Sequence, residues 1–230
     1  MDQKEYYTFG NPTSSLVFIQ LVNEHDSQMM EKEASFLSDQ ADNADWCIAA
    51  VPVADWNRDL TPWAADPVFG NLSFGAGAPE TLEHLTAHII PEIEKEYSHA
   101  YRRYILCGYS LAGLFSLWAA YQTDMFDGVI AASPSVWYPG WLPYAEKRQL
   151  RARYVYLSLG DREERTKNPV MASVGKNIRL MHEVLAERGT TCQLDWNPGN
   201  HFVNSNQRMA RGMAWMLNAM GRIVEVCDTM

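Results

Sequence analysis

The chain of 230 residues carries a net charge of −9 at pH 7, and 47% of its residues are hydrophobic, 12% aromatic and 20% charged. This is the composition of an ordinary globular protein with enough apolar side chains for a sizeable core, so we expect a single domain over residues 1–230. The acidic balance, in a sequence without a basic stripe, argues against a nucleic-acid partner, and no run approaches the ~18 apolar residues that cross a membrane.

Short apolar runs that favour strands alternate along the chain with longer stretches of helical periodicity. Strands are predicted over residues 15–22, 46–52, 103–107, 128–133, 153–159 and 190–196. Helices are predicted over residues 31–40, 81–97, 111–121, 177–188 and 209–220, the second of them kinked by Pro91. This alternation predicts an α/β fold with a doubly wound, mostly parallel sheet and helices on both faces. In such a fold ligands bind beyond the carboxyl ends of the strands, and the long irregular segment 57–78 is expected to contribute there.

The segment GYSLAG at 108–113 joins a predicted strand to a predicted helix and has the pattern of a nucleophile elbow. Such a turn strains the serine backbone and lifts the hydroxyl clear of the sheet, and the residues two before and two after it must be small, as Gly108 and Ala112 are. The helix N-terminus aims backbone N–H groups, among them that of Leu111, at a developing oxyanion. Ser110 is therefore the candidate nucleophile, although a glycine-rich turn of a Rossmann-like sheet matches the same short pattern.

The general base is expected downstream of the nucleophile and of the acid, just past the last strand. His201 follows the predicted strand 190–196 in a turn-rich loop and is the candidate. His84 and His88 lie four residues apart on one helix, without the HExxH pattern or third ligand of a metal site, and His182 lies inside an amphipathic helix. The alternative is that His201 is a surface-loop residue without a catalytic role.

The acid is expected after the strand 153–159, where the sequence GDREE at 160–164 offers three carboxylates. In many hydrolases of this fold, with serine, acid and histidine in that order along the chain, the acid lies three residues after the glycine that ends this strand. This spacing selects Glu163. Asp161, with a shorter side chain at the strand tip, is the alternative acid, and Glu164 is expected to face solvent. A charged loop with the acid elsewhere is the third possibility.

Six segments together resemble the putative-esterase family of α/β-hydrolases, which includes enterochelin (siderophore) esterases, S-formylglutathione hydrolase, and feruloyl and acetyl-xylan esterases. They run in family order from about residue 55 to 202, so the resemblance covers most of the chain. The segment RDLTP at 58–62 looks more like the enterochelin-esterase branch. The segments are RDLTP at 58–62, IIPEIEKEY at 89–97, GYSLAGLF at 108–115, ASPSVW at 132–137, GDRE at 160–163 and GNH at 199–201.

The resemblance implies a serine esterase that works through a Ser110–His201–Glu163 triad and an acyl-enzyme, on siderophore-type or aromatic esters. The loop after the first strand lacks the Asp-Gly pair common in relatives, and we assign the second oxyanion N–H, beside that of Leu111, to Asn23. No metal or cofactor is implied. The alternatives are a carbohydrate (acetyl or feruloyl) esterase, an acyltransferase on the same fold, and a binding module that has lost its chemistry.

Two groups of aromatic residues lie in irregular segments on the expected pocket side, and they could wall a substrate site or merely pack the core. We select Trp63, Trp137 and Tyr138 as candidate substrate-binding residues. Arg58 is a further candidate, because a guanidinium suits a substrate carboxylate or phenolate, and a structural pair with Asp55 or Asp59 is the alternative. The two groups are Trp56, Trp63, Phe69 and Phe74, and Trp137, Tyr138, Trp141 and Tyr144.

The N-terminal sequence has no apolar segment of the kind found in signal peptides, so we expect a cytoplasmic protein whose partner is a small-molecule ester. The four cysteines have no CxxC spacing and are expected to be free thiols rather than disulfides or metal ligands. They are Cys47, Cys107, Cys192 and Cys227.

Overall fold

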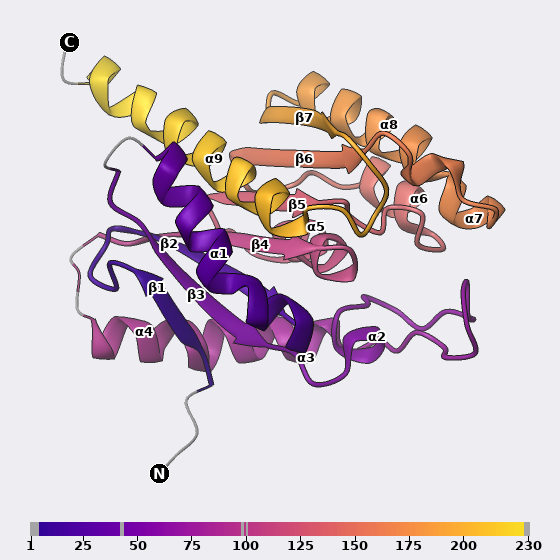
Figure 1. The fold of residues 1–230 in the computed structure, drawn as a ribbon, viewed down its shortest axis with the longest axis horizontal. Helices are drawn as coiled ribbons and strands as arrows, with labels where there is room; N and C mark the ends of the chain where they lie inside the picture. Colours follow the sequence, from indigo (N-terminus) through magenta and orange to yellow (C-terminus); the bar gives the residue numbers. More distant parts are fainter. Residues whose placement is uncertain (1–4, 42–43, 98, 100, 228–230) are drawn as a thin grey trace.

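The computed structural model describes residues 5–41, 44–97, 99 and 101–227, and for residues 222–227 the backbone alone. The seven strands in this part of the chain form one sheet in the order β1-β3-β2-β4-β5-β6-β7 (Figure 1). Every neighbouring pair is parallel except β1 and β3, which pair antiparallel at the edge. The strands are β1 (Tyr7–Gly10), β2 (Leu16–Val22), β3 (Cys47–Pro52), β4 (Arg103–Tyr109), β5 (Gly128–Ala132), β6 (Tyr154–Gly160) and β7 (Thr191–Asn197).

The α/β architecture with a mostly parallel sheet is confirmed, and so are the six predicted strands, each end of which differs by no more than two residues. Strand β1 is the one that the sequence did not predict. It has four residues, Tyr7 and Gly10 at its ends are exposed, and it lacks the buried apolar run that marks β2. An edge strand is held mainly by backbone pairing with its neighbour, so its sequence carries little pattern.

The five predicted helices are also confirmed, with longer bounds at several ends. The first begins at Glu24 rather than at 31, because Asn23 caps it: the Asn23 Oδ1 accepts a hydrogen bond of 2.9 Å from the Asp26 N–H. Short helices in the connecting segments were not predicted. The helices are α1 (Glu24–Gln40), α2 (Trp56–Asp59), α3 (Ala78–His84), α4 (Ile90–Glu96), α5 (Leu111–Gln122), α6 (Trp141–Glu146), α7 (Pro169–Ala172), α8 (Val174–Glu187) and α9 (Ser205–Cys227).

The irregularity expected at Pro91 takes the form of a π-helical turn. Helices α3 and α4 are continuous through the π turn η1 (Leu85–Ile89), which ends two residues before Pro91. A proline has no N–H to donate and its ring crowds the preceding turn, and a wider π turn accommodates both. The buried side chains Leu85, Ile89 and Ile93 still form one apolar stripe against the sheet.

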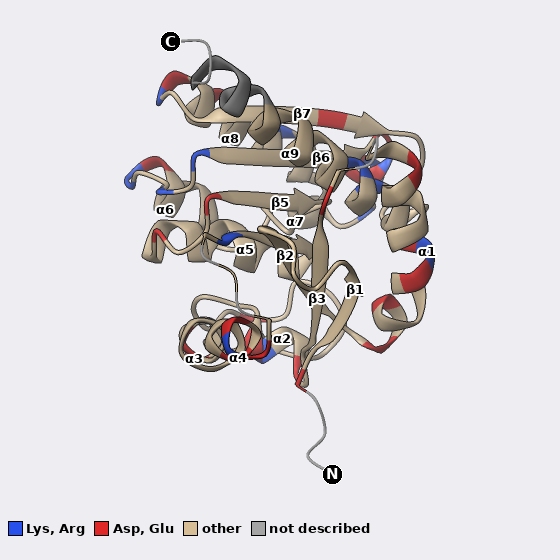
Figure 2. Ribbon diagram, turned by 90° about the vertical axis from the view of Figure 1, so that its left-hand side faces the viewer, with Lys and Arg blue, Asp and Glu red and all other residues tan. Residues whose placement is uncertain are grey.

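Helices cover both faces of the sheet, and each layer has its own core. Helices α1 and α9 pack on one face, where Phe18 of β2 shares a buried cluster with Met30 and Met213, while α4, α5 and α8 pack on the other, whose cluster includes Ile19 and Phe115. Figure 2 shows α1 on one side of the strands and α4, α5 and α6 on the opposite side. The central strands are therefore buried on both faces, which explains why their sequences are nearly continuous apolar runs.

The sheet has its topological switch point between β2 and β4, because β3 follows β2 on one side and β5 follows β4 on the other. The loops beyond the carboxyl ends of these strands diverge there, and ligands bind at such a crevice in open α/β sheets. Asn23 follows β2 and Ser110 follows β4, so both flank this point.

Among the described helices, none combines the length and the apolar character that a membrane span requires. Cys47 and Cys107 are buried free thiols and Cys192 is a partly buried one, while the side chain of Cys227 lies outside the described part of the chain.

Candidate active site

Ser110 lies at the sharp turn between β4 and α5, with a backbone conformation that non-glycine residues rarely adopt. Its φ and ψ are 60° and −120°, and strain of this kind is concentrated at functional sites. The turn is held from both sides: the Ser110 N–H donates to the carbonyl of Ala132 at 3.1 Å, and its own carbonyl accepts from the Ser135 N–H at 3.0 Å. A Cβ on Gly108 would lie 2.2 Å from the carbonyl carbon of Ala112, so the elbow requires glycine there.

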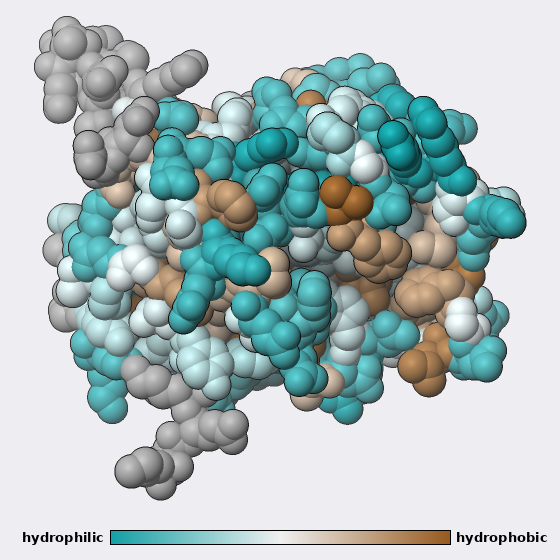
Figure 3. Space-filling model, viewed as in Figure 1, coloured by the Kyte–Doolittle hydropathy of each residue, from teal (hydrophilic) through white to brown (hydrophobic). Residues whose placement is uncertain are grey.

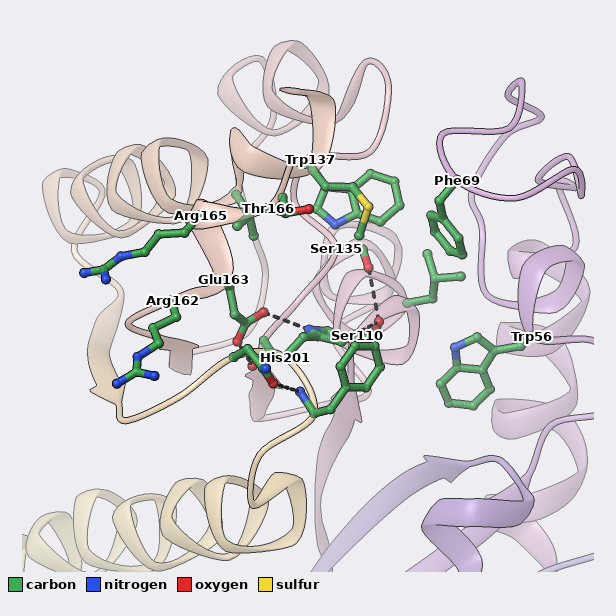
Figure 4. Close-up of a pocket in the computed structure, with 16 residues that line it drawn as sticks. Trp56, Phe69, Ser110, Ser135, Trp137, Arg162, Glu163, Arg165, Thr166 and His201 are labelled. Carbon is green, nitrogen blue, oxygen red and sulfur yellow. Dashed lines mark hydrogen bonds and ion pairs between the residues drawn. The ribbon is translucent and has the colours of Figure 1, made fainter. Parts of the chain in front are cut away.

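Three side chains predicted from the sequence meet at the carboxyl edge of the sheet. The Ser110 Oγ lies 3.1 Å from His201 Nε2, and His201 Nδ1 lies 2.7 Å from Glu163 Oε2 (Figure 4). Ser110 comes from the end of β4, Glu163 from the turn after β6 and His201 from the loop after β7. This is the geometry of a nucleophile hydrogen-bonded to a base that is itself oriented by an acid.

The Glu163 carboxylate is buried and makes four hydrogen-bonding contacts. Besides His201, it accepts from the Gly160 N–H at 2.7 Å, from the Ser133 hydroxyl at 2.7 Å and from Arg208 at 2.8 Å, all at Oε1. Burial alone raises the pKa of Glu163, but the hydrogen bond and charge of His201, together with the contacts to Ser133 and Gly160, outweigh it and bring the pKa below its ordinary value. The side chain is thus held as a carboxylate with Oε2 directed at the imidazole.

Asp161, the alternative acid, makes different contacts. Its Oδ1 accepts from the Gly199 N–H at 2.8 Å and lies 4.0 Å from Arg162 Nε. The side chain is half exposed and has no hydrogen bond to His201 among the described residues. Asp161 therefore supports the loop that carries His201, and the geometry favours Glu163 as the acid. Glu164, expected to face solvent, pairs with Arg179 at 3.0 Å on the surface.

Leu111 and Asn23, whose backbone amides are predicted from the sequence to form an oxyanion hole, both lie next to Ser110. Leu111 begins α5 immediately after the serine, and Asn23 lines a cavity that Ser110 and His201 also line. No hydrogen bond to either amide is found within the described part of the chain. The first N–H groups of a helix have no partner within the helix, and they are free to bind an anion.

The larger of two cavities at Ser110 has a volume of about 660 Å³ and a mainly apolar wall. Trp56, Phe69 and Trp137 form its aromatic side, facing Ser110 in Figure 4. Arg162 and Arg165 lie beyond Glu163 with their guanidinium ends turned away from the serine. The surface in this region is apolar too: large exposed hydrophobic residues include Phe69 and Phe202, and apolar surface gathers in the right-hand half of the face in Figure 3.

A smaller cavity of about 270 Å³ adjoins the same serine and is more polar. Asn23, His25 and Asp26 from the loop after β2 and the start of α1 line it, together with Tyr109 of β4. Burial raises the pKa of Asp26, partly offset by the charge of His25. Ser110 thus lines two adjoining cavities, which share Trp56 and Phe202 and of which the smaller has more polar side chains in its wall.

The remaining predicted binding residues lie as follows. Trp137 lines the large cavity, whereas Tyr138 and Trp63 do not: the Tyr138 hydroxyl donates to the Trp63 carbonyl at 2.5 Å, and Trp63 Nε1 donates to the Pro139 carbonyl at 2.8 Å. These two side chains tie the 57–78 segment to the segment after β5. Arg58 is exposed and pairs with Asp59 at 2.7 Å, one of the two structural partners considered from the sequence, and it lines neither cavity at Ser110.

The sequence did not single out Arg208, Tyr109 or Ser133, which surround the Glu163–His201 pair. Arg208 is one of several arginines near the C-terminus and has no motif of its own. Its burial depends on where α9 docks, which no local pattern reports. In the part of the chain that the structure describes, no three His, Cys, Asp or Glu side chains are grouped so as to hold a metal ion.

The sheet order, the helices on both faces and the serine elbow at the end of β4 define an α/β-hydrolase fold. Solved structures share it. The siderophore hydrolase EstA from Aspergillus nidulans aligns with a TM-score of 0.70 and 21% identity over 89% of this chain and 82% of its own. The enterochelin esterase from Shigella flexneri aligns with a TM-score of 0.71 and 15% identity over 94% of this chain and 54% of its own.

Sequence comparison agrees with the structural one. The chain is 27% identical over 139 residues to the uncharacterized protein YbbA of Bacillus subtilis (strain 168), a match that spans 58% of this chain and 56% of YbbA. The model of the family described as "Putative esterase" matches residues 27–205. The chain belongs to this family, as the resemblance in its sequence implied.

Proposed function

We propose that the protein is a serine esterase that cleaves carboxylic esters through an acyl-enzyme on Ser110. The observation that supports this most directly is the continuous chain of contacts from Ser110 through His201 to the buried, ionised Glu163, at 3.1 Å and 2.7 Å, opening on a cavity of about 660 Å³. A serine hydroxyl is a weak nucleophile, and a hydrogen-bonded base oriented by an acid activates it.

In the first step His201 Nε2 removes the Ser110 proton as Oγ attacks the ester carbonyl carbon. The tetrahedral oxyanion accepts hydrogen bonds from the N–H groups of Leu111 and Asn23, and the imidazolium is stabilised by Glu163. His201 then gives its proton to the departing alkoxide, which leaves as the alcohol. Water attacks the acyl-serine with His201 again as base, and collapse of the second intermediate releases the acid and restores the Ser110 hydroxyl.

The aromatic wall of the large cavity supports an ester with a bulky aryl group. Trp56, Phe69 and Trp137 present ring faces and edges to the space beside Ser110, and the smaller cavity, lined by Asn23 and Asp26, adjoins the same serine. An aryl ester that carries polar groups beyond the scissile bond suits this pair of cavities. Two of the similar structures are a siderophore hydrolase and an enterobactin esterase, the latter crystallised with 2,3-dihydroxy-N-benzoyl-serine. We therefore propose siderophore-type or related aromatic esters as substrates.

Labelling with a fluorophosphonate probe tests the nucleophile. The wild-type protein is expected to be labelled at Ser110, and Ser110→Ala is expected to lose both labelling and ester hydrolysis with an unchanged melting temperature. Ser135→Ala is the matched control, because the Ser135 hydroxyl lies 3.4 Å from that of Ser110 but has no contact with His201 among the described residues. Labelling that persists in Ser110→Ala, or that moves to Ser135, rules out the proposed mechanism.

A panel of esters tests the substrate class. Purified protein is expected to hydrolyse aromatic acyl esters with higher kcat/KM than acetyl esters of sugars. Equal rates across the panel contradict the assignment of the aromatic wall to substrate binding. Adding an alcohol acceptor separates hydrolysis from acyl transfer, since a transferase releases the acyl group mainly as a new ester.

A further inference from the structure

Arg208 is the fully buried cation of the site. It lies in the first turn of α9 (Ser205–Cys227), with 1% of its surface exposed. It does not line either cavity at Ser110, so it is out of reach of a substrate there. A buried guanidinium is costly unless it is paired and hydrogen-bonded, and the contacts it makes show what it is paired with.

The two ends of the Arg208 fork bind two different parts of the site. Nη1 donates to Glu163 Oε1 at 2.8 Å, to the Ser133 hydroxyl at 2.8 Å and to the Tyr109 hydroxyl at 3.1 Å. Nη2 donates to the Asn200 carbonyl at 2.8 Å and reaches that of Pro198 at 3.4 Å. One planar group therefore holds the acid through Nη1 and, through Nη2, the loop that carries the base.

Tyr109 closes the same network from β4. Its hydroxyl accepts from Arg208 and donates to the His201 carbonyl at 2.7 Å. A Cβ on Gly160 would lie 2.9 Å from Arg208 Nη2 and 3.0 Å from Glu163 Oε1, so the glycine that ends β6 leaves room for this approach. Gly160 thus allows the acid and the arginine to approach the end of β6 closely.

We propose that Arg208 is a positioning residue of the esterase: it holds the Glu163 carboxylate and the His201 loop in register, and its charge sets the pH range in which the Glu163–His201 pair is ready to accept the Ser110 proton. This inference rests on the proposed function. It makes Arg208 a fourth functional residue that never touches the substrate.

The effect of the Arg208 charge depends on the other charged groups that face the Glu163–His201 pair. His201 is faced by Glu163 from the turn after β6 and by Asp26 from α1, and Tyr109 of β4 packs on its ring. Burial raises the pKa of Tyr109 to about 12, so its hydroxyl stays neutral. Arg208 is then the one permanent cation in contact with Glu163 among the described residues. Removing a cation increases the proton affinity of every neighbouring group, so the pair would take up a proton at higher pH.

Two substitutions separate charge from geometry. Arg208→Met removes the charge, and the acid limb of the kcat/KM profile is expected to move to higher pH by roughly one unit or more. Arg208→Lys keeps the charge but cannot bind the carboxylate and the two loop carbonyls at once. Its acid limb is expected to stay in place, while kcat falls on the order of 10- to 100-fold with little change in KM.

Arg211 provides the matched control. It lies three residues further along α9, is exposed, and donates from Nη1 to Asn197 Oδ1 at 2.7 Å at the end of β7, and it has no hydrogen bond or ion pair with Glu163 among the described residues. Arg211→Met and Arg211→Lys are expected to leave the acid limb and kcat close to wild type. Melting temperatures of all four variants report the purely structural contribution.

These measurements distinguish a positioning role of Arg208 from a purely structural one. If both Arg208 variants lower the melting temperature but leave kcat and the acid limb as in the Arg211 variants, Arg208 is structural and the inference is overturned. If Arg208→Met does not fold, Arg208→Lys decides, and an unchanged kcat overturns the inference. A wild-type protein that is not labelled at Ser110 means instead that the proposed function itself fails.

Discussion

Glu33 of α1 provides a test of the structure that is independent of catalysis. Its side chain is buried against the sheet, where it contacts Gln20 of β2, and Glu33 Oε1 has no hydrogen-bond partner in the described part of the chain. Burial, opposed by the Gln20 hydrogen bond and reinforced by the charge of Asp26, raises the pKa of Glu33 from 4.5 to about 8. The folded protein therefore keeps a proton that the unfolded chain releases.

The difference between the pKa of Glu33 in the folded protein and in the unfolded chain sets how stability changes with pH. The contribution of Glu33 to the free energy of unfolding is greatest below pH 4.5, where both states are protonated, and it declines as the pH rises toward 8 because unfolding then releases a proton. At about 1.4 kcal/mol per pH unit, the two and a half units between the ordinary pKa and pH 7 amount to roughly 3 kcal/mol. Glu33→Gln keeps the shape and removes the titration, and its amide can donate to Gln20 Oε1, which is also without a partner among the described residues.

Thermal unfolding at several pH values measures the difference directly. Glu33→Gln and wild type are expected to melt together near pH 4.5, and the variant is expected to melt roughly 6–12 °C higher at pH 7. Glu31→Gln, at an exposed position of the same helix, is the control and should follow the wild type throughout. A gap that does not change with pH, or a variant that is less stable at pH 7, refutes the reasoning.

Other predictions concern the site. Glu163→Gln is expected to lower kcat on the order of 10⁴-fold, and Asp161→Asn much less; the reverse order in steady-state kinetics would transfer the acid's role to Asp161. Trp137→Ala should raise KM for aromatic esters and spare acetyl esters, and a uniform change in KM would mean that the ring only packs the core. Because Arg58 is exposed and paired with Asp59, Arg58→Ala should alter melting and turnover little, whereas a KM increase confined to anionic esters would give it a substrate role. Gly108→Val should abolish labelling at Ser110, and retained labelling would show that the close approach to Ala112 is not required.

The nucleophile elbow could be predicted from the sequence because its requirements are local. Gly108, Ser110 and Ala112 lie within one turn, and the clash that forbids a larger residue at Gly108 involves a neighbour four positions away. Strand and helix flank the turn directly, so the pattern specifies its own context. The strand positions were equally accessible, since the central strands are buried on both faces and read as uninterrupted apolar runs.

The pocket wall was predicted only in part, because residue type does not distinguish a side chain that lines a cavity from one that packs beside it. Trp137 lines the cavity, but its neighbour Tyr138 turns its hydroxyl to the Trp63 carbonyl. Trp63 in turn donates to the Pro139 carbonyl. Aromatic residues with a polar atom find a partner when buried, and which partner is in reach depends on how two loops distant in sequence meet.

The choice between Asp161 and Glu163 as the acid rests on local spacing in the sequence, whereas the reason for that spacing lies in contacts between distant segments. Both Asp161 and Glu163 follow β6, and the glycine-plus-three spacing favoured Glu163, whose catalytic role stays a prediction. The structure adds the reason for the spacing: Glu163 turns back toward the strand end, where the Gly160 N–H and the Ser133 hydroxyl bind Oε1 and leave Oε2 for His201. Asp161 instead binds the Gly199 N–H. Glu163 therefore binds the His201 imidazole, and Asp161, two residues earlier, binds the backbone of the loop that carries His201.

Arg208 extends the same logic to a residue that no motif marks. It lies seven positions after His201, and Arg211 three positions further on looks equivalent in sequence, yet one is buried against Glu163 and the other is exposed. The difference arises from the packing of α9 on the sheet face shared with α1. A buried carboxylate beside a base needs a counter-charge that does not compete for the base, and a guanidinium bound to the opposite oxygen meets that need. The orientation and ionisation of Glu163 therefore depend on α9, which carries Arg208, as well as on the turn after β6 that carries Glu163 itself.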